Sequence, residues 1–128
     1  MLFRSRSCHD LSEGGLAVAL AEMAFAGGLG AQVSLADVPR DSGASSVLVL
    51  LFSESPTRFL VEARPECLPE LAFFWKGVPF CRLGNVIGAS PEHGDASPRL
   101  TVQGMDGSIV IDAATAELKA AWQGPLRW

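Results

Sequence analysis

A long apolar stretch with helical spacing governs how this chain can fold. Leu16 and Leu20 recur at helical intervals within a run of alanine, valine and leucine, Ser12 can cap its start, and Gly27-Gly28 can end it. Alanine and leucine are strong helix formers. The sequence therefore predicts a helix over residues 12–25 that is apolar on nearly all sides and covered on more than one face.

The other segments predict a mixture of strands and helices. Strands are expected at residues 31–35, 46–53, 57–63, 78–87, 100–102 and 108–111, helices at 65–76 and 113–122, loops at 39–46 and 90–98, and a turn at 104–107. The aliphatic run at 46–53 is typical of a central strand buried on both faces, and Glu54-Ser55-Pro56 would join it to 57–63 as a hairpin. This order predicts a single mixed α/β (α+β) domain with helices packed on a largely antiparallel sheet.

Length, charge and cysteine usage limit the classes of protein to which this chain can belong. The 128 residues suit one domain, and 19% charged residues is below the usual ~25%, so part of the apolar surface is expected to be covered by something else. The net charge is −4 and the ten basic residues are dispersed along the chain, so the sequence predicts no basic patch for binding nucleic acid. No apolar run approaches the ~18 residues of a membrane span. Three cysteines without metal-ligand or disulfide spacing suit a reduced, cytoplasmic compartment.

Polar residues crowd the segment that leads into the apolar helix, and Gly14 and Gly15 fall in its first turn. Glycine inside a helix costs about 1 kcal/mol relative to alanine, so the pair indicates close approach of another backbone or of a phosphate. The alternative is a capped, tightly packed helix start with Ser12 as the N-cap. Glu13 would repel an anion unless a cation such as Mg²⁺ lay between them. We expect Gly14→Val to abolish ligand binding with little effect on folding.

A second polar cluster, residues 53–58, follows the predicted central strand. Functional groups often occupy such strand ends, but an exposed Glu54–Arg58 ion pair worth under ~1 kcal/mol is the alternative. His9 is a candidate general base or ligand, or a structural residue beside an acidic neighbour. Cys8 has no partner for nucleophilic chemistry and is expected to be a small buried side chain.

Three motifs, at residues 9–24, 51–59 and 82–86, resemble the C-terminal-type α/β domain of phosphoribosylformylglycinamidine synthases, the synthetase subunits of purine biosynthesis. The similarity runs from Ser7 to the C-terminus and is specific in order and spacing. This family belongs to the aminoimidazole ribonucleotide synthetase superfamily. Other members, such as selenophosphate synthetase and a hydrogenase maturation protein, share weaker versions of the first motif.

The resemblance implies an ATP-dependent C–N ligase. ATP activates the formamide oxygen of formylglycinamide ribonucleotide, and glutamine-derived ammonia replaces it, giving the amidine, ADP and phosphate. The parent enzyme would use ATP and Mg²⁺, with most of their ligands on an N-terminal-type partner domain. The resemblance assigns no catalytic residue and no metal ligand to this chain. It implies substrate or phosphate contacts from residues of the first two motifs: Asp10, Ser12, Gly14, Gly15, Glu54, Ser55 and Arg58, with His9 as a further candidate.

The resemblance also implies that residues 1–128 are one domain of a longer enzyme. Such a domain would be inactive alone, bind no cofactor tightly, contact the partner domains of the same enzyme, and self-associate through uncovered apolar surface. Two alternatives stay open. One is a stand-alone binding or interaction module, and the other is a domain of a different superfamily member, such as the hydrogenase maturation protein or selenophosphate synthetase.

Overall fold

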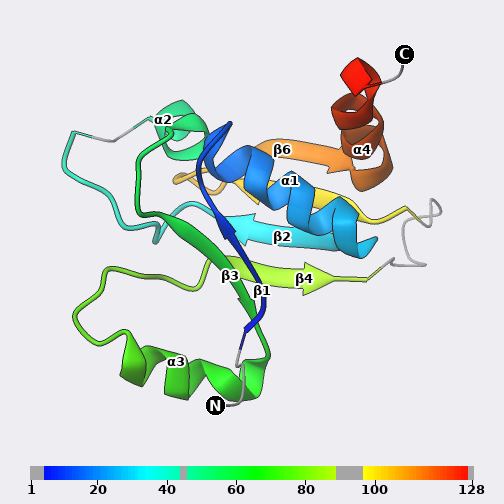
Figure 1. Cartoon of the computed structure of the whole chain (residues 1–128). Coiled ribbons are helices and arrows are strands. Elements are labelled where there is room, and N and C mark those ends of the chain that lie inside the picture. Colours follow the sequence, from blue (N-terminus) through cyan, green and yellow to red (C-terminus); the bar gives the residue numbers. More distant parts are fainter. Residues whose placement is uncertain (1–4, 44–45, 89–96, 127–128) are drawn as a thin grey trace.

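A computed structural model describes residues 5–43, 46–88 and 97–126 of the chain (Figure 1). The elements are, in order, β1 (Ser5–Asp10), α1 (Gly15–Gly27), β2 (Gly30–Ser34), α2 (Val47–Phe52), β3 (Phe59–Ala63), the 3-10 helix η1 (Pro65–Cys67), α3 (Leu68–Phe74), β4 (Gly84–Ile87), β5 (Arg99–Gln103), β6 (Ile109–Ala114), α4 (Thr115–Gln123) and the 3-10 turn η3 (Gly124–Leu126).

The strands form two separate sheets. The larger is a mixed four-stranded sheet with the order β4-β2-β5-β6, in which β2 and β5 are parallel and the outer pairs are antiparallel. The smaller is an antiparallel ribbon of β1 and β3, which crosses obliquely over the larger sheet in the view of Figure 1. The predicted architecture, a mixed and largely antiparallel sheet with packed helices, is confirmed.

The long apolar helix forms as α1, and its own glycines mark both ends. Gly14 is the N-cap in the left-handed conformation, so Ser12 is not the cap. Gly28, also left-handed, ends the helix by donating its N–H to the carbonyls of the last turn. The residues that α1 buries are Gly15, Leu16, Ala17, Ala19, Leu20 and Ala24. Leu16, Ala17, Ala19 and Leu20 among them form one core with the four-stranded sheet, whose Leu100 and Val102 are almost completely enclosed.

The predicted central strand at residues 46–53 is wrong, because Val47–Phe52 form the helix α2. The N–H of Leu50 donates to the carbonyl of Ser46 at 3.1 Å, as in a helical turn. Leu50 and its neighbour Leu51 are both buried, whereas Leu48 is 68% exposed. A strand would turn adjacent side chains to opposite faces. The run is buried on one side only, against α1, and its six apolar residues carry no periodicity that separates helix from strand.

The hairpin predicted for residues 46–63 is therefore wrong as well. β3 pairs instead with β1, placing Cys8 opposite Val61 and His9 opposite Leu60. The sequence did not predict β1, whose polar alternate positions gave little strand signal. The strand predicted at 78–87 forms only from Gly84 onward.

The remaining elements follow the prediction. The strands at β2, β5 and β6, the turn between the last two, the helix at α3 with its η1 start, and the terminal helix α4 are confirmed. The loop at 90–98 falls mostly on residues 89–96, and part of the loop at 39–46 on residues 44–45, which lie outside the described residues. None of the helices described here has the length and apolarity to cross a membrane.

Candidate functional site

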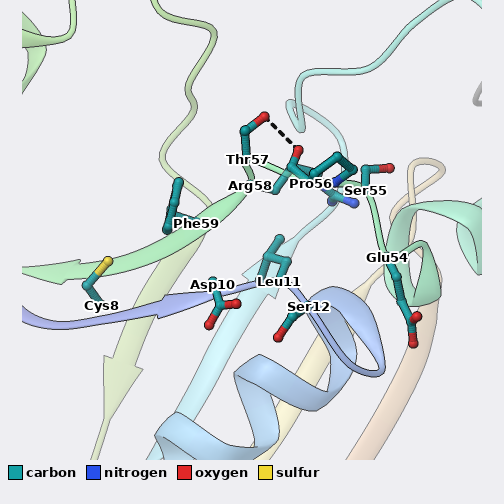
Figure 2. Close-up of a pocket in the computed structure, with 10 residues that line it drawn as sticks. All are labelled: Cys8, Asp10, Leu11, Ser12, Glu54, Ser55, Pro56, Thr57, Arg58 and Phe59. Carbon is teal, nitrogen blue, oxygen red and sulfur yellow. Dashed lines mark hydrogen bonds between the residues drawn. The ribbon is translucent and has the colours of Figure 1, made fainter.

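The first two motifs meet at one open pocket of about 720 Å³. Figure 2 shows its walls, which come from the end of β1 and from the turn between α2 and β3. Two hydrogen bonds from backbone N–H groups join these walls. The N–H of Leu11 donates to the carbonyl of Arg58, and the N–H of Gly14 donates to the side-chain Oε1 of Glu54, both at 2.9 Å. The lining residues are Cys8, Asp10, Leu11, Ser12, Glu54, Ser55, Pro56, Thr57, Arg58 and Phe59.

Five of the eight predicted site residues line this pocket: Asp10, Ser12, Glu54, Ser55 and Arg58. Gly14 and Gly15 lie beside the pocket at the start of α1, and His9 is the residue of β1 that directly precedes Asp10. Two segments that are far apart in the sequence are thus brought together at one pocket. Which of these residues contact a substrate stays a prediction.

The two glycines serve the packing of α1. Both have positive φ, 74° at Gly14 and 64° at Gly15, where a side chain is strained. A Cβ on Gly15 would lie 2.8 Å from the carbonyl oxygens of Leu51 and Ser53, so the close approach at this position is that of the backbone at the end of α2. A Cβ on Gly14 would collide with the side chain of Val18. The expectation that Gly14→Val leaves folding almost unaffected is therefore wrong.

Glu54 binds the N-terminal end of α1 from a distant part of the chain. Its carboxylate accepts from Gly14, at the end of the helix where the unpaired N–H groups and the dipole favour negative charge. A capped, tightly packed helix start was one of the two sequence interpretations, but its cap is wrong: the N-cap is Gly14 and not Ser12, and the Glu54 carboxylate binds the N–H of Gly14 from outside the helix. A phosphate that accepts from the N–H of Gly14 would have to displace the Glu54 carboxylate.

Arg58 holds the turn that carries Glu54. Its Nη1 donates to Oγ of Ser53 at 2.8 Å and to the Ser53 carbonyl at 3.4 Å, and its Nη2 donates to the carbonyl of Leu50 at 3.4 Å. These acceptors lie at the C-terminal end of α2, where carbonyls lack helical partners. Arg58 therefore closes α2 and fixes the pocket wall.

Five residues that line the pocket were not among the predicted site residues: Cys8, Leu11, Pro56, Thr57 and Phe59. Thr57 has φ 66°, which is rare for a β-branched residue, and its hydroxyl donates to the carbonyl of Pro56 at 2.6 Å. Phe59 is 64% exposed at the rim. Cys8 is exposed in the pocket, so its expected burial is wrong. The alternation of β1 would have predicted an exposed Cys8 had that strand been recognised.

His9 contacts α1 rather than the pocket. Its Nδ1 donates to the carbonyl of Asp10 at 2.6 Å, and its Nε2 donates to Oε2 of Glu22 at 2.8 Å. The hydrogen bond to the Asp10 carbonyl is the main cause that raises the pKa of His9, the Glu22 carboxylate adds to it, and partial burial opposes it. Of the two interpretations of His9, these contacts support the structural one.

The acidic residues of the pocket do not form a metal site by themselves. Within residues 5–43, 46–88 and 97–126, no three histidine, cysteine, aspartate or glutamate side chains are grouped closely enough to hold a metal ion.

Two relatives that match almost the whole chain are far longer than it. It is 39% identical over 124 residues to the phosphoribosylformylglycinamidine synthase subunit PurL of Alkaliphilus metalliredigens, covering 95% of this chain and 15% of that protein. For PurL of Thermobifida fusca the identity is 40% over 122 residues, covering 94% and 14%. The chain thus spans about one seventh of the length of these relatives.

Solved structures show the same fold. The T. maritima PurL structure complexed with ADP aligns with a TM-score of 0.73 at 25% identity, covering 89% of this chain and 18% of that one. A family model described as "AIR synthase related protein, C-terminal domain" matches residues 3–92, which is more than half of the 128 residues. The resemblance seen in the motifs is thereby confirmed, and the chain belongs to the family of C-terminal domains of AIR synthase related proteins.

Proposed function

We propose that this chain is the C-terminal domain of a phosphoribosylformylglycinamidine synthase, the ATP-dependent C–N ligase of purine biosynthesis. The observation that carries the proposal is the 39–40% identity to PurL subunits over at least 94% of the chain. The pocket supports it, because two of the motifs that carry the resemblance build its walls. The parent would convert formylglycinamide ribonucleotide, ATP and ammonia to the amidine, ADP and phosphate.

Within that enzyme, this domain contributes one wall of a site between domains. Asp10, Ser12 and Ser55 present polar side chains to the pocket and are the proposed substrate contacts. Glu54, Arg58, Gly14 and Gly15 hold the two walls together through the contacts described above. The direct ligands of this wall would thus be hydroxyl and carboxylate groups, which suit hydrogen-bond donors on the substrate.

ATP and Mg²⁺ would be held mainly by the partner domains of the parent. T. maritima PurL has been solved in complexes with ATP, ADP and FGAR, which supports binding of nucleotide and substrate by the parent enzyme. This chain alone would hold neither cofactor tightly and would be inactive. A cytoplasmic location is also proposed, since the three cysteines would stay reduced there.

A domain exchange tests this function. The matching segment of Alkaliphilus metalliredigens PurL would be replaced by this chain, and ADP release measured with ATP, Mg²⁺, ammonia and formylglycinamide ribonucleotide. We expect the chimera to turn over and the isolated 128-residue chain to release no ADP. In the chimera, Asp10→Asn is expected to lower kcat/KM for the ribonucleotide about tenfold, the loss of one charged hydrogen bond of about 1.4 kcal/mol.

Asp41→Asn is the matched control, because Asp41 is an exposed aspartate outside the pocket. It is expected to leave kcat/KM unchanged. A chimera that melts cooperatively near the temperature of the parent yet releases no ADP would overturn the proposal in favour of a stand-alone module. ADP release by the isolated chain would overturn the proposed dependence on partner domains.

A further inference from the structure

A continuous chain of hydrogen bonds links the C-terminal helix to the pocket. The indole Nε1 of Trp122 on α4 donates to Oε1 of Glu22 on α1 at 3.0 Å. The other carboxylate oxygen of Glu22 accepts from Nε2 of His9 on β1 at 2.8 Å, and Nδ1 of His9 donates to the carbonyl of Asp10 at 2.6 Å. Three elements that are distant in sequence are thereby joined.

The chain of contacts ends on a single peptide group of the pocket wall. The carbonyl of Asp10 accepts from His9, and the N–H of the same peptide group, on Leu11, donates to the carbonyl of Arg58 at 2.9 Å. Both residues that flank this peptide group line the pocket. Its orientation is therefore fixed from both sides, by His9 and by the turn before β3.

The chemistry of the two acceptors selects the protonation state of His9. A carbonyl oxygen and a carboxylate can only accept, so both ring nitrogens must carry hydrogen, which is the case for imidazolium alone. Neutral imidazole has one N–H and can satisfy either Asp10 or Glu22, leaving a lone pair against the other. Loss of the proton therefore breaks one of the two hydrogen bonds that His9 makes.

The charged groups around His9 favour the protonated form of its ring. Glu22 from α1 and Asp10 from its own strand, with Oδ1 3.8 Å from Nδ1, are the acidic groups that face the ring. The ribbon partner opposite His9 is the apolar Leu60, and α4 contributes the neutral indole of Trp122. These charges agree with the raised pKa of His9.

The hydrogen bond between Trp122 and Glu22 is one of the contacts that hold α4 on the rest of the domain. Thr115 is the buried residue of this helix, and Trp122, 49% exposed, rests on the ring of Phe25 with centroids 5.7 Å apart. Leu118 also packs against the core, partly buried, so the contacts of Trp122 add to a small apolar attachment of this helix.

We propose that His9, Glu22 and Trp122 form a relay of positioning residues that couples α4 to the Asp10–Leu11 peptide group, closed when His9 is protonated and loosened when it is neutral. The relay involves only residues of this chain and does not rest on the proposed function. A group with a raised folded-state pKa stabilises most strongly below its unfolded value, here 6.5, and loses that contribution as pH rises through the folded value. The relay therefore opens toward alkaline pH.

NMR titration of the 128-residue chain tests the relay. The His9 ring, the indole N–H of Trp122 and the amide of Leu11 are followed from acidic to alkaline pH and assigned with His9→Gln and Trp122→Phe. We expect all three signals to share one midpoint above 6.5. Trp122 or Leu11 signals that stay flat while His9 titrates would overturn the proposal.

Two variants move the midpoint in opposite directions. Glu22→Gln removes the charge and is expected to lower the His9 midpoint, with loss of the shared titration at Trp122. Trp122→Phe keeps the ring on Phe25 but removes a donor to Glu22, so the carboxylate binds His9 more strongly and the midpoint rises. Because Trp122 is half exposed, this variant tests the coupling even where Glu22→Gln fails to fold.

Glu117→Gln is the matched control, because Glu117 is an exposed acid on α4 outside the relay. Its His9 midpoint is expected to equal that of the unmodified chain. Equal midpoints in Trp122→Phe and the unmodified chain would show that α4 and His9 are not coupled and would overturn the relay.

Discussion

Gly15 illustrates how a single residue can carry a packing requirement. It combines a left-handed backbone with two backbone oxygens 2.8 Å from the place of its missing Cβ. The left-handed conformation costs a non-glycine residue roughly 1–2 kcal/mol, and overpacking roughly 1–3 kcal/mol. We expect Gly15→Ala to lower the free energy of unfolding by about 3 kcal/mol, measured by urea denaturation.

The control is Gly43→Ala, since a Cβ on Gly43 meets no atom within 4 Å. It is expected to change the free energy of unfolding by less than about 0.5 kcal/mol. Similar losses in both variants would mean that the contact with the end of α2 is not what requires glycine at position 15.

Thr57 is the second residue whose backbone conformation opposes its side chain. At φ 66° a β-branched residue is strained, whereas asparagine tolerates this region. We expect Thr57→Asn to raise the melting temperature by about 2–4 °C, corresponding to a gain of about 0.5–1 kcal/mol. Thr57→Val keeps the branched Cβ and is expected to gain nothing. A Thr57→Asn protein that melts no higher than Thr57→Val would show that the backbone is not strained there.

At the level of elements, α2 is where local pattern and structure disagree. Its helical geometry makes the adjacent Leu50 and Leu51 face the core and leaves Leu48 in solvent. We expect Leu51→Ala to lower the free energy of unfolding by about 3 kcal/mol and Leu48→Ala by less than about 0.5 kcal/mol. A central strand buried on both faces would lose comparable free energy in both variants, so urea denaturation of the pair separates the two structures.

At the scale of the whole molecule, the fold leaves apolar side chains exposed on α3 and on the segment that follows it. α3 buries none of its residues, Phe73 and Phe74 are 74% and 67% exposed, and Val78 and Phe80 extend the apolar surface beyond the helix. Contiguous apolar surface of this kind marks contact sites and promotes association. It agrees with the low charge of the chain and with a place inside a larger assembly of domains.

Self-association through this surface is testable. We expect the apparent mass of the isolated chain from light scattering to rise with concentration, and the double variant Phe73→Ser/Phe74→Ser to hold it at that of the monomer. Leu48→Ser, which removes an exposed apolar side chain on α2 instead, is the control and should associate like the unmodified chain. Undiminished association of the double variant would place the contact elsewhere.

The sequence by itself determined the mixed α/β class, the apolar helix α1, most of the sheet and the two segments that build the pocket. Helical spacing, strand alternation and glycine ends are local properties, so the sequence reports them directly. The tertiary structure alone decided that residues 47–52 are helical, that β3 pairs with β1, and that His9 contacts Glu22 rather than the pocket. It also decided that Gly14, and not Ser12, is the N-cap of α1, and that Glu54 accepts from its N–H. Each of these depends on which distant segment supplies a hydrogen-bond partner or covers an apolar side, and local periodicity carries no record of that choice.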